Sequence, residues 1–314
     1  IYCYIPNIII SQFDFFLYIL FYIFQNLLKK ALIFTNFYFI LNLLHFIIQS
    51  IIKKYDTQGS SPVLIMANDL NQWVCKYRDV NQLFNELLAY QFAKIWQINI
   101  PEGAFIEIDY EKHIKPLEDK RGLERRFFER ECFGSLFLQN AIEVNKTILT
   151  DKDIIRRIKN KNDLLKIALF DIWLSNEDRT FNNYNLLLQA IKGGFSILYI
   201  IDNTEIFNSS MAYDQSMELI TQGDSVLNSD LATFIFKNDT ETVREMNDLL
   251  KEFPIFTKNC QDNLQSILNQ VPQKWHIDLQ SHKTKIDIIF TEDWLKICEH
   301  TFRKYIQTSI IHKP

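Results

Sequence analysis

The sequence predicts an α+β fold with a small strand-rich lobe, then a mainly helical lobe, preceded by a hydrophobic extension. Three observations predict it. Residues 1–54 are dense in Ile, Phe, Leu and Tyr and nearly free of charge. Residues 55–138 hold short strand-like runs around one amphipathic helix, and residues 139–314 hold several helical stretches around a single hairpin. A chain of 314 residues is long enough to bury a sizeable core in such an arrangement.

The hydrophobic extension has two interpretations that both stay open. Ala31–Ile52 carries no charged residue, is long enough to cross a bilayer, and is flanked by lysine pairs at 29–30 and 53–54. A membrane anchor is therefore physically possible. The alternative is a spurious extension translated from AT-rich DNA, because the apolar run is interrupted by polar residues, namely Asn36, Asn42, His45 and Gln49.

Charge, cysteine and glycine content exclude several classes of protein. With 34 basic and 38 acidic residues the formal charge is -4, which gives no general attraction to nucleic acid. The five cysteines have no paired spacing, so a reduced cytosolic compartment is expected, with membrane anchoring through residues 31–52 as the alternative. The seven glycines form neither GxGxxG nor GxxxxGK[ST], so any phosphate is held differently from Rossmann or Walker-type sites.

Strands and one helix are expected in the small lobe. "VLIMA" and "WVCKY" predict a hairpin joined through "NDLNQ", and "AFIEIDY" predicts a further strand. Between them, "VNQLFNELLAYQFAKIWQI" predicts a helix. "CFGSLFL", residues 132–138, is expected to be the extended connection between the lobes. The helix places an apolar stripe on one face, consisting of Leu83, Leu87, Leu88, Phe92 and Ile95.

The larger lobe is expected to be helical except for one hairpin. "DKDIIRRIKN" and "NDLLKIALFDIWL" predict amphipathic helices. "NLLL", a "KGG" turn and "FSILYIID" predict the hairpin, and residues 208–314 predict several further helices.

A polar segment between two apolar runs is the strongest functional signal. "LFDIWLSNEDRTFNNYNLLL", Leu169–Leu188, holds three acidic residues and four asparagines beside sequence that predicts a core. Asp178 could accept a hydroxyl proton, and Asn183 could offer an amide oxygen to Mg²⁺. Asp202 closes an apolar strand and could be a second ligand, although a capping or turn role would also explain it.

A carboxylate that faces a hydroxyl and ligands for Mg²⁺ are two requirements of phosphoryl transfer. This reaction also needs a cation on the nucleotide phosphates and a group that holds this cation. Lys76 on the second strand and Glu86 on the following helix are candidates. The alternative places both side chains on solvated faces. Asn176 and Arg179 are expected to brace the polar segment, with Asp171 as a further acceptor.

These residues and motifs resemble the HipA-like kinases, especially their short stand-alone members. "SSPVLIMANDLNQWVCKYR", "NELLAYQFAKIWQINIPEGAFIEI", "NEDRTFNNYNLLL" and "VPQKW" carry the resemblance over about residues 57–307. It implies a kinase-like fold that uses ATP and Mg²⁺. Lys76 would bind the nucleotide phosphates, held by Glu86. Asp178 would be the catalytic carboxylate, Asn183 and Asp202 would hold the metal, and Asn185 is the motif's second asparagine.

The sequence departs from the family pattern at several positions. Asn203 stands where short members usually have a histidine after the metal-binding aspartate. The loop before the first strand of the predicted hairpin is poor in glycine, so backbone phosphate contacts would come from Gly59, Ser60 and Ser61. Residues 1–52 do not resemble the N-terminal subdomain of full-length HipA toxins, so a toxin role does not follow.

Three functions are consistent with the sequence. The first is an ATP- and Mg²⁺-dependent kinase that phosphorylates a hydroxyl, such as Ser or Thr of a protein. The second is a catalytically inactive kinase fold that binds nucleotide or a partner. The third is a membrane-tethered small-molecule or lipid kinase, which requires residues 1–52 to be genuine. The partners expected are ATP and a hydroxyl acceptor, without nucleic acid.

Overall fold

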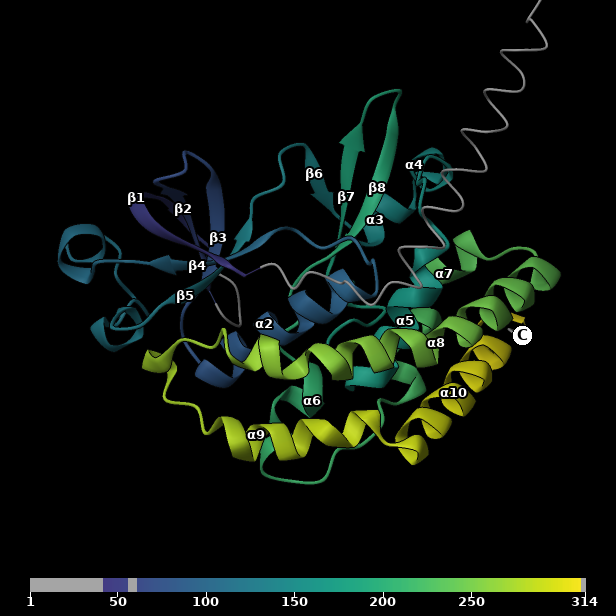
Figure 1. Cartoon of the computed structure of the whole chain (residues 1–314). Helices are drawn as coiled ribbons and strands as arrows, with labels where there is room; N and C mark the ends of the chain where they lie inside the picture. The colour runs from purple at the N-terminus through teal and green to yellow at the C-terminus, as the bar shows by residue number, and fades with distance from the viewer. Residues whose placement is uncertain (1–41, 56–60, 312–314) are drawn as a thin grey trace, which may run out of the picture. The chain divides into compact units, whose positions relative to one another are not determined.

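The computed structural model describes residues 42–55 and 61–311, and its first feature is a closed five-stranded barrel (Figure 1). The barrel order is β1-β2-β3-β5-β4, and every neighbouring pair is antiparallel except β1 and β4, which are parallel. The barrel strands are β1 Leu44–Lys54, β2 Val63–Ala67, β3 Gln72–Lys76, β4 Gly103–Glu107 and β5 Cys132–Leu136.

Strand β1, Leu44–Lys54, lies before residue 55, where the sequence predicts that the small lobe begins. Residues 44–52 belong to the possible membrane-spanning run 31–52, but the structure pairs this strand with β2 and β4. The physical reason is that four of the eleven residues of β1 are isoleucines, and β-branched side chains favour strands. Residues 31–41 of that prediction lie outside the described residues. Within 42–55 and 61–311, the structure contains no helix with the length and apolar character needed to span a bilayer.

The other strand predictions for this part of the chain hold, with one correction. The β2–β3 hairpin and β4 form where the sequence predicts them. The segment expected to connect the lobes instead forms β5, because Cys132–Leu136 pairs with both β3 and β4. Only Phe137 and Leu138 of the predicted connection lie outside this strand.

Helix α2, Val80–Ile95, packs against the barrel and the helices below it (Figure 1). Asp79 caps its N-terminus by accepting hydrogen bonds from the backbone N–H groups of Asn81 and Gln82. The predicted apolar stripe is buried. However, polar Asn85 and Glu86 are also buried, so the helix is enclosed on more than one face.

The remaining chain is a three-stranded sheet with helices around a large apolar core (Figure 1). At its centre, Trp96 stacks on Trp173 and on Phe256, with ring centroids 5.2 Å apart in both pairs. The sheet contains β6 Ala141–Glu143, β7 Leu186–Ile191 and β8 Phe195–Ile200, and the predicted hairpin is β7–β8. The helices are α3 Lys146–Leu149, α4 Lys152–Arg156, α5 Asp163–Leu174, α6 Ile206–Ser209, α7 Asp230–Ile235, α8 Asp239–Leu268, α9 Leu279–Ile286 and α10 Glu292–Ile306. Short 3₁₀ turns lie at Arg125–Phe128, Met211–Tyr213, Gln222–Asp224, Val226–Asn228, Gln273–Trp275 and Asp287–Phe290, and π turns at Tyr110–Ile114 and Gln307–Ile311.

Candidate active site

Lys76 connects three elements that are far apart in the sequence. It ends β3, and its Nζ donates to Glu86 Oε1 of α2 at 2.5 Å and to Asp202 Oδ1 just after β8. Burial alone would lower the pKa of Lys76, but the two carboxylates outweigh burial and raise it. The ammonium is therefore charged at any physiological pH and lies between two acidic groups.

Asp202 lies where the chain leaves β8. Its backbone is in the left-handed region, with φ of 51°, which aspartate tolerates better than most residues. Thr204 Oγ1 donates to Asp202 Oδ1 at 2.8 Å, and the side chain is 35% exposed. Burial alone would raise the pKa of Asp202, but the Lys76 ammonium outweighs it and the pKa is lowered.

Asp178 lies in the loop that follows α5, and two asparagines orient its carboxylate. Asn183 Nδ2 donates to Asp178 Oδ1, and Asn185 Nδ2 donates to Asp178 Oδ2, both at 2.8 Å. Each carboxylate oxygen can accept about two hydrogen bonds, so both keep capacity for a further donor. The hydrogen bond from Asn183 to Asp178 uses Nδ2 of Asn183 and not its Oδ1.

A buried ion pair between Arg179 and Asp171 supports this loop. Arg179 Nη1 donates to Asp171 Oδ1 of α5 at 2.5 Å, and both side chains are almost fully buried. Arg179 Nη2 donates to the carbonyl of Ile201 at 3.0 Å and to Asn203 Oδ1 at 2.8 Å. Burial raises the pKa of the Asp171 carboxyl to about 6, while the Arg179 charge and an amide hydrogen bond from Asn176 oppose this rise. Arg179 thus connects the Asp178 loop to the segment that carries Asp202.

Five of the predicted site residues converge on one cleft between the barrel and the β6–β8 sheet. Its volume is about 960 Å³, and its polar lining includes Lys76, Glu86, Asp178, Asn183 and Asp202. Its apolar lining comes from the barrel, the connection after β5, and the sheet, and includes Val74, Pro101, Leu136, Phe137, Leu138, Leu187 and Ile201. Charged and amide side chains therefore line one part of the cleft and apolar side chains line another. Such a cleft suits a ligand with a charged end and an apolar end.

Other predicted site residues lie outside the cleft lining. Asn176 and Arg179, which the sequence predicts to brace the polar segment beside Asp178, are fully buried, and both donate to Asp171 Oδ1. Ser61 is buried, and its carbonyl accepts a hydrogen bond from the Tyr77 hydroxyl at 2.8 Å. Gly59 and Ser60 lie outside the described residues, so backbone phosphate contacts in that loop stay a prediction.

Asn203, which departs from the family pattern in the sequence, makes two contacts in the structure. Its backbone N–H donates to Glu86 Oε1 at 3.0 Å, and its Oδ1 accepts from Arg179. Asn208 was missed entirely, although its side chain contacts Glu177 next to Asp178. The only signal for Asn208 was a polar "NSS" run interrupting an apolar context, which also fits an ordinary turn.

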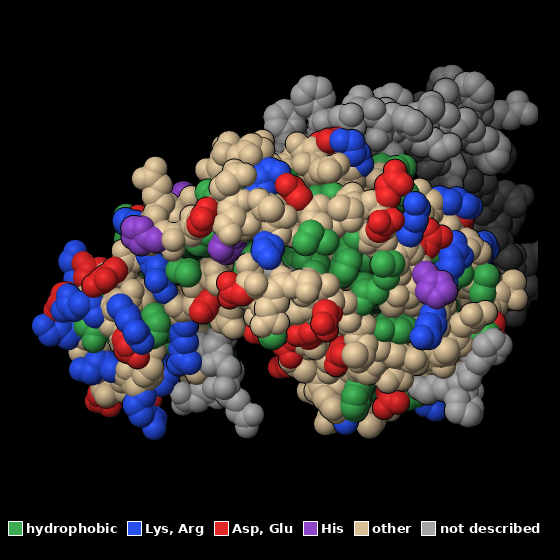
Figure 2. All heavy atoms as spheres, turned by 90° about the horizontal axis from the view of Figure 1, so that it is seen from below, with side chains coloured by type: hydrophobic (Ala, Val, Ile, Leu, Met, Phe, Trp, Pro, Cys, Tyr) green, Lys and Arg blue, Asp and Glu red, His purple; other side chains and the backbone are tan. Residues whose placement is uncertain are grey.

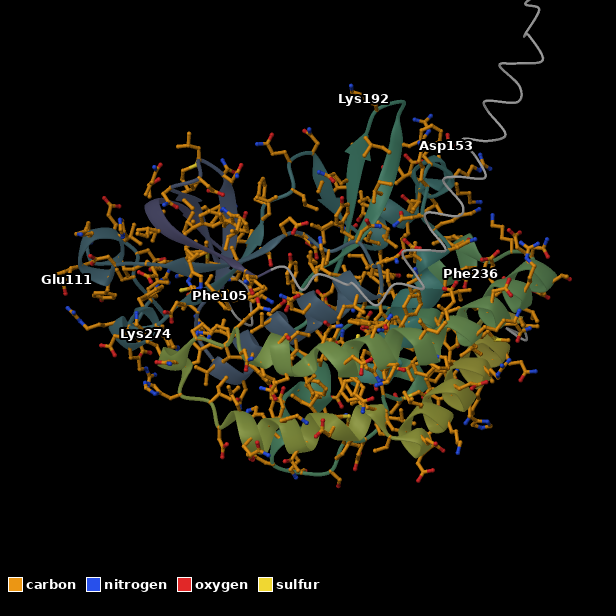
Figure 3. All side chains as sticks on the ribbon, in the orientation of Figure 1. Phe105, Glu111, Asp153, Lys192, Phe236 and Lys274 are labelled. Carbon is orange, nitrogen blue, oxygen red and sulfur yellow. The ribbon has the colours of Figure 1, made fainter. Side chains whose placement is uncertain are left out.

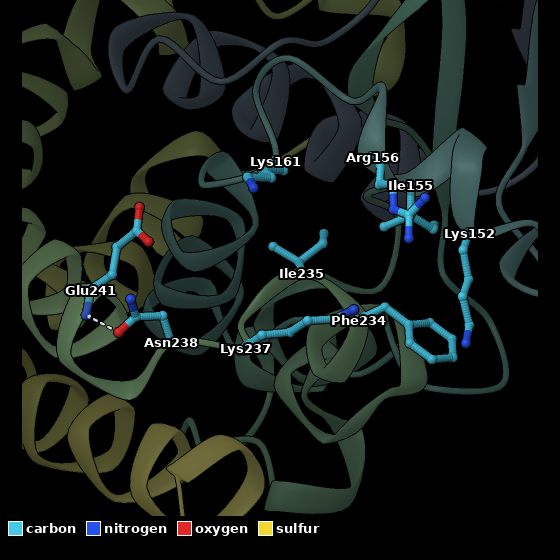
Figure 4. A pocket seen from close by; sticks show the side chains of 9 residues that line it. All are labelled: Lys152, Ile155, Arg156, Lys161, Phe234, Ile235, Lys237, Asn238 and Glu241. Carbon is cyan, nitrogen blue, oxygen red and sulfur yellow. Dashed lines mark hydrogen bonds between the residues drawn. The ribbon is translucent and has the colours of Figure 1, made fainter.

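Two further charged regions lie outside this cleft. A basic pocket of about 320 Å³ includes Lys152, Arg156, Lys161 and Lys237, and Figure 4 shows these side chains around the opening without a common point of convergence. Lys and Arg side chains also gather at one end of the face in Figure 2. The charged segment at residues 109–126 is largely paired internally, through Lys112–Asp109, Lys115–Glu111, Arg121–Asp119, Arg125–Glu111 and Arg126–Glu124.

A barrel followed by a helix whose glutamate pairs with the barrel lysine, together with the hairpin and helices after it, defines a kinase-like fold. The structure is similar to the crystal structure of a Helicobacter pylori proinflammatory kinase, CtkA, with a TM-score of 0.50 and 11% sequence identity over 85% of this chain and 100% of that one. The chain belongs to the HipA-like kinase family, whose sequence profile matches residues 48–306. A comparison with curated proteins gave no match.

Proposed function

We propose that this HipA-like kinase uses ATP and Mg²⁺ to phosphorylate a hydroxyl group, such as that of Ser or Thr in a protein. The observation that carries the proposal is the convergence of Lys76, Asp178, Asn183 and Asp202 on one cleft. These side chains come from β3, the loop after α5 and the end of β8, so chain proximity does not explain their meeting. In this proposal the barrel with α2 is the small lobe and the remaining helices with β6–β8 are the large lobe.

Lys76 would bind the nucleotide phosphates. Glu86 is nearly fully buried and fixes the direction of the Lys76 ammonium, which is the arrangement that kinases use to hold phosphates. The apolar lining of the cleft would accommodate the base. Lys76 also pairs with Asp202, so nucleotide binding would exchange this carboxylate for phosphate oxygens.

The donors in the cleft fit Mg²⁺. Asp202 offers a carboxylate and Asn183 an amide oxygen, and a hard cation of this size is usually held by one or two such side chains together with substrate phosphates. No cluster of three or more His, Cys, Asp or Glu that could hold a metal occurs among residues 42–55 and 61–311, so the phosphates would complete the coordination. When bound, Mg²⁺ would neutralise charge on the transferred phosphoryl group.

Asp178 would contact the acceptor hydroxyl. Both of its oxygens are held by amide donors, so the carboxylate has a fixed direction before any substrate binds. A fixed carboxylate can orient the hydroxyl and accept its proton during transfer.

The proposed location is the cytoplasm, which supplies ATP and keeps thiols reduced. The free thiols of Cys75, Cys132, Cys260 and Cys298 are consistent with that location.

Replacing Asp202 by alanine is expected to lower the rate of phosphate transfer by about 10²- to 10⁴-fold, because a metal ligand that stabilises the transition state is lost. The measurement is transfer of labelled phosphate from ATP by the full chain over a range of Mg²⁺ concentrations. Asp262→Ala is the matched control, since Asp262 lies on the surface of α8 and pairs only with Lys258. Equal transfer by the parent and both variants would assign the activity to a contaminant.

A catalytically inactive nucleotide-binding module is the second candidate. Two observations favour it: Asn203 replaces the family histidine, and Lys76 is already paired with the carboxylate that would bind the metal. Calorimetric ATP binding by the parent, without transfer to any acceptor or to itself, would select this function over the kinase.

A further inference from the structure

The chain after Asp202 contains a left-handed turn, which takes up most of the short element α6, Ile206–Ser209, and continues to Ser210. Phe207, Asn208, Ser209 and Ser210 have φ values of 57°, 50°, 56° and 68°. None of them is glycine, and side chains with a Cβ disfavour this conformation because the Cβ approaches the following carbonyl oxygen. A run of four such residues persists only where the surrounding structure determines it, and such strain occurs preferentially at functional sites.

The left-handed turn contacts the loop that carries Asp178. Asn208 donates from its backbone N–H to the carbonyl of Ser175 at 3.1 Å, and from Nδ2 to Glu177 Oε1 at 2.9 Å. Ser209 Oγ donates to Glu177 Oε2 at 3.1 Å. Both carboxylate oxygens of Glu177 are therefore held by this turn, and Glu177 immediately precedes Asp178.

Other contacts hold the turn itself in place. Asn208 Nδ2 also donates to the carbonyl of Glu218 at 3.0 Å, and its Oδ1 accepts from the Glu218 N–H at 2.9 Å. On the opposite side, Asn85 of α2 donates to the carbonyl of Ile206 at 3.1 Å and to Ser210 Oγ at 3.0 Å. The Phe207 side chain is fully buried. Helix α2 therefore supports Lys76 through Glu86 and the turn through the adjacent Asn85.

We propose that the left-handed turn at residues 207–210 positions Glu177 and Asp178 for the acceptor hydroxyl, with Asn208 as the principal positioning residue. The inference rests on the proposed kinase function. A right-handed turn would direct the Asn208 amide away from Glu177, because side chains project differently when the sign of φ changes. The left-handed backbone at Asn208 is therefore retained because it lets the Asn208 side-chain amide contact both Glu177 and Glu218.

The test is to replace Asn208 by glycine in the full chain and to measure kcat and the KM for ATP. Glycine keeps the left-handed backbone accessible and removes only the side-chain hydrogen bonds. The expected result is a kcat lowered by about 10- to 100-fold, as for a displaced catalytic group, with an unchanged KM for ATP because Lys76 is untouched. Asn140→Gly is the matched control, since Asn140 is exposed, has φ of 58° and does not line the cleft.

Ser209→Ala provides a milder second variant, because Ser209 is exposed and its removal deletes one hydrogen bond to Glu177. A smaller decrease in kcat is expected from it, again with unchanged KM. If the parent transfers phosphate and both variants keep its kcat, or if KM for ATP rises in parallel with the loss of kcat, the positioning role is refuted and the kinase proposal stands. A parent that transfers no phosphate refutes both.

Discussion

Replacing Asp178 by asparagine is expected to lower the rate of phosphoryl transfer by about 10²- to 10⁴-fold, the contribution of a positioned general base. Asparagine has nearly the same shape as aspartate but cannot accept the hydroxyl proton. Its amide would also place one N–H₂ group against the amide donors of Asn183 or Asn185. The measurement is single-turnover transfer of labelled phosphate at saturating ATP and Mg²⁺.

Nucleotide affinity separates this effect from a general loss of structure. Asp178 makes no hydrogen bond to Lys76, so the dissociation constant for ATP measured by calorimetry is expected to stay unchanged in Asp178→Asn. Asp153→Asn is the control, because Asp153 lies in α4 (Figure 3) and pairs only with the exposed Arg156. Full activity in Asp178→Asn would exclude Asp178 as the catalytic carboxylate.

Replacing Asp171 by asparagine is expected to lower the free energy of unfolding by about 3–5 kcal/mol, the cost of breaking a buried ion pair on one side. The guanidinium of Arg179 would then be buried without its carboxylate partner. Denaturant unfolding followed by fluorescence measures this change, because Trp173 lies in the same helix, α5.

The converse substitution gives a comparison within the same pair. Arg179→Met removes the buried guanidinium that Asp171→Asn leaves without its carboxylate partner. The double variant Asp171→Asn, Arg179→Met is therefore expected to recover part of the loss in Asp171→Asn. A surface pair such as Asp153–Arg156 contributes about 1 kcal/mol or less, so Asp153→Asn sets the baseline. A loss in Asp171→Asn no larger than this baseline would contradict a supporting role for the pair.

Local patterns in the sequence predicted much of the fold. The β2–β3 and β7–β8 hairpins and α2 formed where alternation and helical periodicity indicated them. Strand β1 was not predicted, because a charge-free apolar run without clear periodicity does not distinguish a membrane helix from a strand. The sequence of strand β5 predicts an extended connection for a similar reason. The pattern of its five residues does not indicate that they pair with two strands that are distant in the sequence.

The sequence by itself determined which chemical groups are available: a strand lysine, a helix glutamate, and carboxylates and amides in two polar segments beside apolar runs. Only the tertiary structure decided that Lys76 meets Asp202, 126 residues further along the chain. It also decided that Arg179 donates to Ile201 and Asn203 and that Asn208 faces Glu177. The physical reason is that side-chain type and local period are encoded in neighbouring residues, whereas these contacts depend on how the barrel, α2 and the β7–β8 hairpin pack together.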